Sequence, residues 1–226
     1  MVDRIDGALP QTQCTRCGYP NCRGYARAIA DGSAGIDRCP PGGAEGIARI
    51  AAITGLPVRG LDPAYGEEGP RQLAVIDEAW CIGCTLCLDA CPTDAILGRN
   101  KRMHTVLPLH CTGCERCVPV CPVDCIAMVP VSGSASGWAA WSQTQADEAL
   151  RRYRAHVARQ LQQDGDRPAR GLPAMSGGEE LEGLESNRLA AAERPAPGQA
   201  LHGAAPADPK RALIEAAMQR ARALRG

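Results

Sequence analysis

The sequence contains no phenylalanine, and its 226 residues include only three tryptophans and four tyrosines. Together with 25 glycines and 18 prolines, this leaves little bulky apolar material for one large core. Acidic and basic residues balance at a formal net charge of zero, so the chain has no overall basic field of the kind that attracts nucleic acid. We therefore expect several small units and no nucleic-acid partner.

Long hydrophobic runs are also missing. The sequence has no window of about 18 apolar residues, so we predict no transmembrane segment. Residues 1–30 contain no apolar core of a signal peptide, because Asp3, Arg4 and Asp6 interrupt the first candidate stretch. Without an export signal the thiols are expected to stay reduced in the cytoplasm, where clustered cysteines indicate metal binding and not disulfides.

Cysteine is what the sequence does have, 13 residues in all. The spacing C-x2-C-x2-C-x3-C-P occurs twice, which is the bacterial pattern for two [4Fe–4S] clusters. In such runs the fourth cysteine ligates the other cluster. We therefore expect two exchanged ligand sets: Cys81, Cys84, Cys87 and Cys121 for cluster 2, and Cys111, Cys114, Cys117 and Cys91 for cluster 3.

The two runs form an internal repeat with a shift of 30 residues. In this alignment Cys125 falls where the first half has Ala95, a small packing residue, so we predict that Cys125 is a buried thiol and not a ligand. Ligation by His104 and His110, in the Rieske manner, is an alternative. We disfavour it because eight cysteines already complete two clusters.

Four further cysteines precede the repeat with the spacing C-x2-C-x4-C-x16-C: Cys14, Cys17, Cys22 and Cys39. Four soft thiolates, three of them on one tight loop, suit either a cubane cluster or a zinc ion. The plant-type [2Fe–2S] order, C-x4-C-x2-C, is the reverse of this spacing. The residues themselves leave the choice between iron–sulfur and zinc open.

Apolar periodicity and Gly/Pro punctuation predict helices at 24–30, 44–54 and 144–162, and strands at 73–76, 95–97 and 105–107. The last helix has one apolar side, which is formed by Leu150, Tyr153, Val157 and Leu161. We predict an α+β chain with a small four-cysteine cluster-binding domain (1–56), a linker or strap (57–72), a bacterial 2[4Fe–4S] ferredoxin-like domain (73–131), a helical extension (132–163), a disordered linker (164–207) and a basic C-terminal helix (208–226).

Over residues 5–130 the chain resembles the B subunit of the Rnf/Rsx-type ion-translocating electron transport complex. The resemblance rests on the stretch LPQTQCTRCGYPNC at 9–22, on Cys39, and on residues 73–126 with the double run. It implies that Cys14, Cys17, Cys22 and Cys39 hold a third [4Fe–4S] cluster, cluster 1. The chain would then carry three clusters. The N-terminal membrane anchor of that family is not expected here.

We expect a multi-cluster electron carrier that exchanges electrons with redox protein partners. No nucleophile–base pair, phosphate loop or substrate pocket signature points to an independent catalytic site. An alternative is a peripheral subunit that docks on a membrane-bound ion-translocating redox complex. Both hypotheses give a cytoplasmic location, in the second case at the inner membrane. A structural zinc protein or redox sensor is a third, less favoured hypothesis.

Overall fold

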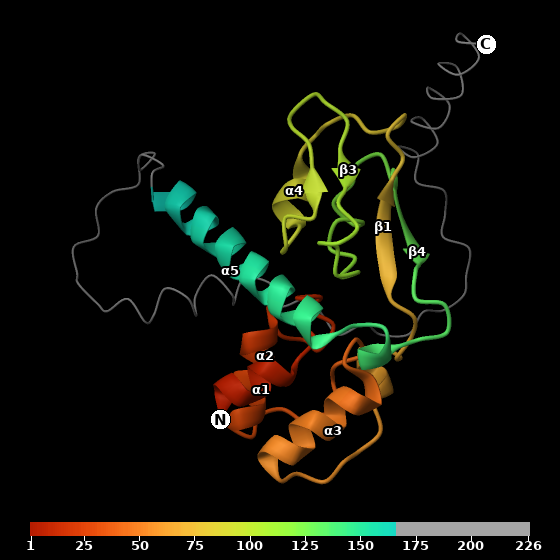
Figure 1. The fold of residues 1–226 in the computed structure, drawn as a ribbon. Helices are drawn as coiled ribbons and strands as arrows, with labels where there is room; N and C mark the ends of the chain where they lie inside the picture. The colour runs from red at the N-terminus through yellow and green to blue at the C-terminus, as the bar shows by residue number, and fades with distance from the viewer. Residues whose placement is uncertain (166–226) are drawn as a thin grey trace. The chain divides into compact units, whose positions relative to one another are not determined.

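The computed structural model describes residues 1–165 (Figure 1). Three helices build the N-terminal unit (residues 1–56): α1 (Val2–Ala8), α2 (Cys22–Ala30) and α3 (Gly43–Thr54). α2 begins two residues before the predicted start because the Asn21 side chain accepts the backbone N–H of Gly24 at 2.7 Å. α3 ends as predicted, with Gly55 at φ 75°. α1 was not predicted.

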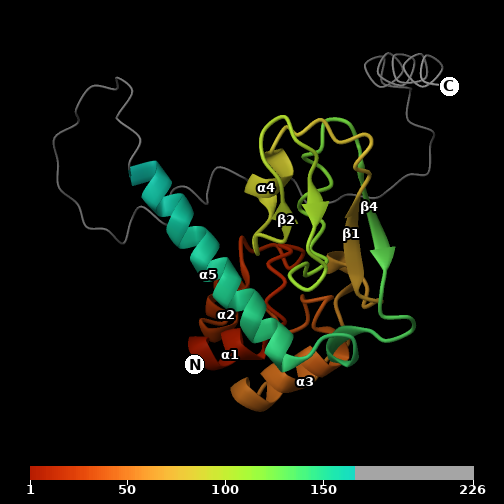
Figure 2. The ribbon, with the colours of Figure 1, turned by 45° about the horizontal axis from the view of Figure 1, so that its top comes forward.

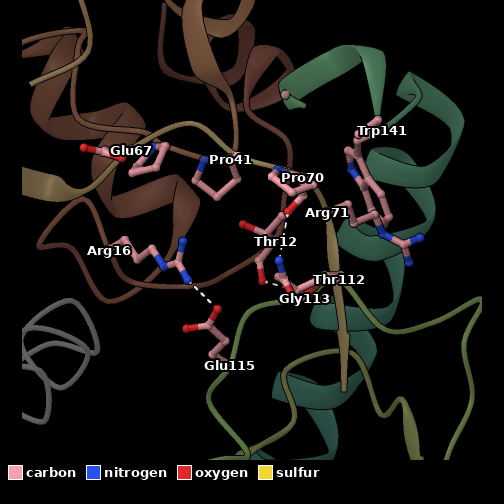
Figure 3. Close-up of a pocket in the computed structure, with 15 residues that line it drawn as sticks. Thr12, Arg16, Pro41, Glu67, Pro70, Arg71, Thr112, Gly113, Glu115 and Trp141 are labelled. Carbon is pink, nitrogen blue, oxygen red and sulfur yellow. Dashed lines mark hydrogen bonds and ion pairs between the residues drawn. The ribbon is translucent and has the colours of Figure 1, made fainter. Parts of the chain in front are cut away.

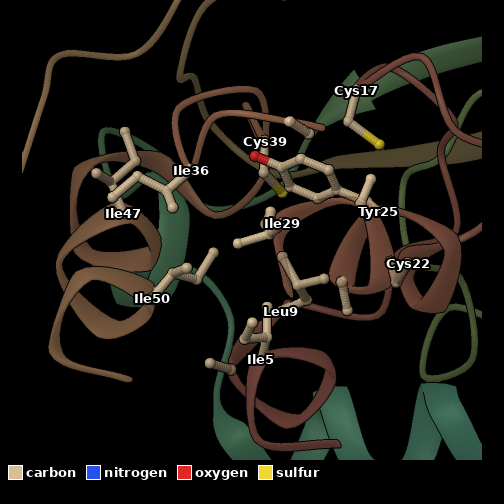
Figure 4. Close-up of a cluster of buried hydrophobic side chains, with 14 of the residues drawn as sticks. Ile5, Leu9, Cys17, Cys22, Tyr25, Ile29, Ile36, Cys39, Ile47 and Ile50 are labelled. Atoms are coloured by element: carbon tan, nitrogen blue, oxygen red, sulfur yellow. The ribbon is translucent and has the colours of Figure 1, made fainter. Parts of the chain in front are cut away.

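The core of this unit is shared between the helices and the cysteine loops. Its fully buried apolar side chains include Ile5 and Leu9 near α1, Tyr25 on α2, and Ile47 and Ile50 on α3. Figure 4 shows three cysteines that belong to the same buried cluster: Cys17, Cys22 and Cys39. Folding of the three helices therefore also fixes the positions of these thiols.

The segment 57–72 is a strap fastened to the N-terminal unit. It contains the short 3-10 helix η1 (Pro63–Tyr65). The backbone N–H of Asp62 donates to the carbonyl of Asp37 at 2.8 Å. The Glu68 carboxylate accepts the backbone N–H of Ala44 at 2.9 Å and the hydroxyl of Ser136 at 2.7 Å. The segment is thus held at several points along its length.

Two small antiparallel sheets and one short helix form the tandem unit, our name for residues 73–131. The first sheet pairs β1 (Gln72–Ile76) with β4 (Ile126–Pro130), and the second pairs β2 (Ile96–Leu97) with β3 (Thr105–Val106). Figure 2 shows β1 and β4 side by side. The short helix is α4 (Leu86–Ala90). Strands β1, β2 and β3 confirm the sequence prediction, whereas β4 was not predicted.

After the 3-10 helix η2 (Gly137–Ala139) comes the long helix α5 (Gln143–Gly165), which agrees with the helix predicted at 144–162. Its buried residues are Ala146, Ala149 and His156, whereas Leu161 is 64% exposed. The predicted leucine, tyrosine and valine stripe is therefore wrong at its C-terminal end. The buried face of α5 is instead formed by two alanines and by His156, which lies one residue before the predicted Val157.

α5 contacts both units. Near its N-terminal end, the Trp141 indole donates to the carbonyl of Pro10 at 2.9 Å. Further along, the His156 ring bonds to the Asp94 carboxylate at 2.8 Å, and Arg159 pairs with the same carboxylate. The helix therefore lies against the N-terminal unit at one end and against the tandem unit at the other.

Helices and small sheets together agree with the mixed α and β class that the sequence predicts. In the described part of the chain, no helix is both long enough and apolar enough to cross a bilayer. The predicted disordered linker, apart from its first two residues, and the predicted helix at 208–226 lie outside the described residues.

Candidate metal centres

A chain of buried amide side chains shapes the loop that carries the first cysteines. The Gln11 side chain donates to the Asp6 carboxylate at 2.9 Å, and Gln13 donates to Gln11 at 2.8 Å. Gln13 in turn accepts the backbone N–H of Cys22 at 3.0 Å. All three polar side chains are at most 3% exposed. They connect α1 to the cysteine loop, and nothing in the sequence pattern indicated this role.

The four N-terminal cysteines lie within electrostatic reach of one another. The pKa of the Cys22 thiol is well above its ordinary value, first because of burial and then because of the charges of Cys39, Cys14 and Cys17. Burial likewise raises the pKa of Cys17 to about 11. We call this set the first site. Without a metal its buried thiols hold their protons, so a bound metal must displace them.

The second site gathers four cysteines from both halves of the repeat. A narrow pocket is lined by Cys81, Cys84, Cys87 and Cys121, together with Cys125 and His104. Burial, followed by the charges of Cys84, Cys81 and Cys121, raises the pKa of Cys87 to about 11. The structure therefore brings together the set that the exchange rule predicted. Their role as ligands stays a prediction.

The third site is the counterpart of the second. Cys91, Cys111, Cys114 and Cys117 line one pocket, and burial raises the pKa of Cys117 to about 12, with the charges of the other three adding to it. The Arg71 guanidinium donates to the carbonyl of Cys111 at 2.6 Å and stacks on Trp141 with its centre 4.8 Å from the ring. The polypeptide around η2 is thereby fastened to the third site.

Backbone N–H groups donate to equivalent cysteine sulfurs in the two halves. The N–H of Ala95 donates to Cys91 Sγ at 3.1 Å, and the N–H of Cys125 donates to Cys121 Sγ at 3.4 Å. The Cys125 thiol lies 3.5 Å from Cys121 Sγ and is 8% exposed, and burial is the first cause that raises its pKa to about 12. Its position agrees with the predicted packing thiol, although the pocket also includes it.

Buried polar contacts around the sites were missed by the sequence analysis. The His104 Nδ1 atom lies 3.2 Å from Cys87 Sγ, and the Thr93 hydroxyl donates to the carbonyl of His110 at 2.9 Å. Arg152 lies 2.7 Å from His110 Nε2, whereas His110 Nδ1 and His104 Nε2 have no hydrogen-bond partner among the described atoms. Both histidines therefore lie beside the proposed ligands, and their closeness in sequence to these cysteines was the available signal.

The three C-x2-C loops share an unusual backbone conformation. Positive φ angles occur at alternate residues: 55° and 63° at Gln13 and Thr15, 69° and 71° at Gly83 and Gly113, and 70° and 63° at Thr85 and Glu115. In each loop these residues flank the second cysteine of the repeat pattern or its N-terminal counterpart Cys14. Alternating conformations of this kind turn successive N–H groups into a concavity for an anion, including at many Fe–S sites.

This conformation is costly for residues with a side chain. A β-branched residue such as Thr15 or Thr85 at positive φ is a genuine outlier, and each such residue costs about 1–3 kcal/mol. Such conformations persist where the surroundings determine them, commonly at ligand sites. The donor sets and the loops that carry them therefore fit an anionic cluster bound through sulfur.

A single metal ion places a different demand on the cysteines. All ligands of one ion lie at bonding distance from one point, whereas each iron of a cluster takes its own cysteine. Within residues 1–165 no group of three or more His, Cys, Asp or Glu side chains has the geometry for one ion.

Comparison with known proteins agrees with these sites. Residues 74–128 match the family model of a 4Fe-4S dicluster domain, and residues 9–41 match the model of a putative Fe-S cluster family. The B subunit of the ion-translocating oxidoreductase complex from Azoarcus sp. is 59% identical over 138 residues, 61% of this chain and 75% of that protein. The protein of the same name from Thiobacillus denitrificans is 54% identical over 138 residues, 61% of this chain and 73% of that protein. The one from Alkalilimnicola ehrlichii is 55% identical over 152 residues, 67% of this chain and 81% of that protein.

Proposed function

The chain belongs to the family of B subunits of the ion-translocating oxidoreductase complex, and from this premise we propose that it transfers electrons through three [4Fe–4S] clusters within a redox complex. Iron–sulfur electron transfer follows from the family and the dicluster domain. The number of clusters, the ligand of each iron and the ferredoxin-like fold of the tandem unit are our proposals.

The proposed ligands are the three cysteine sets described above. Cys14, Cys17, Cys22 and Cys39 hold cluster 1; Cys81, Cys84, Cys87 and Cys121 hold cluster 2; and Cys91, Cys111, Cys114 and Cys117 hold cluster 3. Each half of the repeat gives its fourth cysteine to the other half. The two halves of the ferredoxin-like domain then depend on each other for completion.

The observation that carries the third cluster is the common conformation of the three loops. Gln13 and Thr15 take positive φ angles around Cys14, 55° and 63°, that are similar to those of Gly83 and Thr85 around Cys84, 69° and 70°. One kind of bound group at both places explains why two separate loops accept the same costly backbone. The similarity therefore supports a [4Fe–4S] cluster at the first site and disfavours a zinc ion there.

A [4Fe–4S] cluster, when bound, accepts and donates one electron at a time. The protein residues fix its position, keep it from water and stabilise added charge. Burial of Cys87, Cys91, Cys111 and Cys117 limits solvent access on the inner side of the tandem unit. The N–H groups of Ala95, Cys125 and His104 donate to cysteine sulfurs, which favours the more negative state.

The named relatives are subunits of a complex, so we propose that this chain works beside other redox subunits at a membrane surface. Co-sedimentation with native membranes tests this part. Recovery of the full chain with the membrane fraction, released by high salt, is the expected result. A chain that stays wholly in the supernatant at low salt would contradict the peripheral association.

The cluster number is tested by anaerobic purification of the full chain, with iron and acid-labile sulfide analysis and EPR spectroscopy of the reduced protein. Three cubanes give about twelve irons per chain. About eight irons together with one zinc would contradict the proposal for the first site. The variant Cys14→Ala supplies the matched control, because it should lose about four irons and leave the tandem unit loaded.

A further inference from the structure

The loops of the first and third sites touch each other. Arg16 stands between Cys14 and Cys17, and Glu115 stands between Cys114 and Cys117. The guanidinium of Arg16 lies 2.6 Å from the carboxylate of Glu115 (Figure 3). An ion pair therefore joins two residues that are each enclosed within a ligand loop.

A second contact supports the first. The Thr112 hydroxyl donates to the carbonyl of Thr12 at 3.0 Å, as Figure 3 also shows. Both threonines are 6% exposed, and each lies within two residues of a proposed ligand, Cys14 or Cys111. The two loops are thus held together through a buried hydrogen bond and a partly exposed ion pair.

The contact is selective for one of the two sites of the tandem unit. In the described part of the chain, both polar contacts between the N-terminal cysteine loop and the tandem unit reach the loop that runs from Cys111 to Cys117. The loop of the second site is fastened elsewhere, because the Gly83 carbonyl accepts the backbone N–H of Lys101 at 2.9 Å. The third site therefore lies between the other two in the order of contacts.

The ion pair adds little to stability. Its side chains are 38% and 41% exposed, and a polar cavity of about 300 Å³ opens beside them. Thr12, whose hydroxyl has no hydrogen-bond partner among the described atoms, also lines this cavity. Partly solvated ion pairs stabilise folds weakly. Their placement inside two ligand loops therefore calls for another explanation.

Charge supplies that explanation. A fixed positive charge beside a site stabilises an added electron, and a fixed negative charge opposes it. Arg16 lies within electrostatic range of both Cys14 and Cys114. The Arg16 and Glu115 charges thus bear on the first and third sites together, and they act with opposite signs.

We propose that Arg16 and Glu115 are positioning residues that hold the first and third sites in direct electronic contact, and that Arg16 raises the reduction potentials of these two sites whereas Glu115 lowers them. This inference rests on the proposed three-cluster function. It implies that electrons move in the order first, third and second site, or the reverse. The second site then exchanges electrons with the first only by way of the third.

The test uses the full chain, purified anaerobically, in an EPR-monitored redox titration of Arg16→Gln and Glu115→Gln. We expect Arg16→Gln to move two of the three midpoint potentials to more negative values and Glu115→Gln to move the same two to more positive values. The potential of the second site stays unchanged. Shifts of the same sign in both variants would show a merely structural role and overturn the proposal, as would no shift in either.

The order of sites has its own readout. Reduction of two neighbouring sites broadens their EPR signals by magnetic interaction, and we expect this broadening between the first and third sites of the wild type. It should weaken in both single variants and return in the double variant Arg16→Glu with Glu115→Arg, which restores an ion pair of reversed polarity. Broadening between the first and second sites alone would contradict the proposed order.

Two control variants separate location from charge. Arg151→Gln removes an arginine whose ion pair with Glu148 is also 2.6 Å long but lies on α5, and it should leave all three potentials unchanged. Arg116→Gln removes an arginine at the same place in the Cys114–Cys117 loop as Arg16 has in its own loop, and it should affect the third site alone. Iron analysis precedes each titration. A wild type without about twelve irons fails the proposed function, whereas a fully loaded set with unchanged potentials fails this inference only.

Discussion

The imidazole of His104 lies against the sulfur of Cys87, with 3.2 Å between Nδ1 and Sγ. The histidine is 1% exposed, and it approaches so closely because Gly98 has no side chain, since a Cβ at that position would collide with the ring. When Nδ1 carries the proton, the ring donates a hydrogen bond to the proposed ligand. Such bonds from the surroundings tune the potential of a cluster.

We therefore expect His104→Leu to make the midpoint potential of the second site more negative by tens of millivolts, on the order of 1 kcal/mol for one lost hydrogen bond. His104→Asn keeps an N–H donor near the position of Nδ1 and should retain part of the wild-type potential. A redox titration that resolves the three sites provides the measurement. An unchanged potential in the leucine variant, with full iron content, would contradict this role of His104.

The packing assignment of Cys125 predicts a clear difference between two neighbouring thiols. Cys125→Ala should keep about twelve irons per chain, because the repeat already tolerates Ala95 at the equivalent position. Cys121→Ala should lose about four, since it removes a proposed ligand of the second site. Iron and sulfide analysis of both variants decides the assignment. Iron loss in the Cys125 variant alone would reverse the two roles.

Glycine is required at two equivalent places in the tandem unit. Gly83 and Gly113 have φ angles of 69° and 71°, and a Cβ on Gly113 would stand 2.5 Å from the backbone oxygen of Gln72. We expect Gly113→Ala to destabilise the loaded protein by at least about 2 kcal/mol, because it combines backbone strain with a clash against β1. Denaturant unfolding measures the loss. Gly60→Ala, with open space around its Cβ and an ordinary φ, is the control and should change little.

Removal of the metal should unfold the tandem unit. Its buried residues are mostly cysteines and small aliphatic side chains, including Ala74, Ala95 and Ile96, so its apolar core is small. Cluster binding then supplies much of the folding free energy. Treatment with a chelator under anaerobic conditions should abolish amide protection in β1 and β4. Protection that survives the loss of iron would contradict this expectation.

Local patterns predicted the regular elements well. Three isoleucines at helical spacing, closed by a glycine, predicted α3. α1 was missed because its polar residues, including Asp3 and Asp6, hid a face that buries Ile5. β4, the antiparallel partner of β1, was missed as well.

The contacts around the sites were harder to predict from the sequence than the cysteine sets themselves. The spacing of the cysteines predicts the ligand sets because cluster geometry constrains it, and the cysteines of the second and third proposed sets each line one pocket. The contacts of Gln13, His104 and Arg16 depend on tertiary packing between distant segments, for which the sequence carries no periodic signal. The C-terminal part of the α5 stripe failed for the same reason, because tertiary contacts through Asp94 took precedence over apolar periodicity.

Because β1 pairs with β4, the tandem unit cannot complete its first sheet until late in translation. β1 leaves the ribosome long before its partner, and Cys81 to Cys87 likewise appear before Cys121, which completes their proposed site. At roughly 5–20 residues per second, the interval is several seconds. During this time three thiols next to an unpaired strand are exposed to oxidants and stray metal ions. With the proposed ligand sets, neither cluster of the tandem unit can be completed before nearly the whole unit is translated.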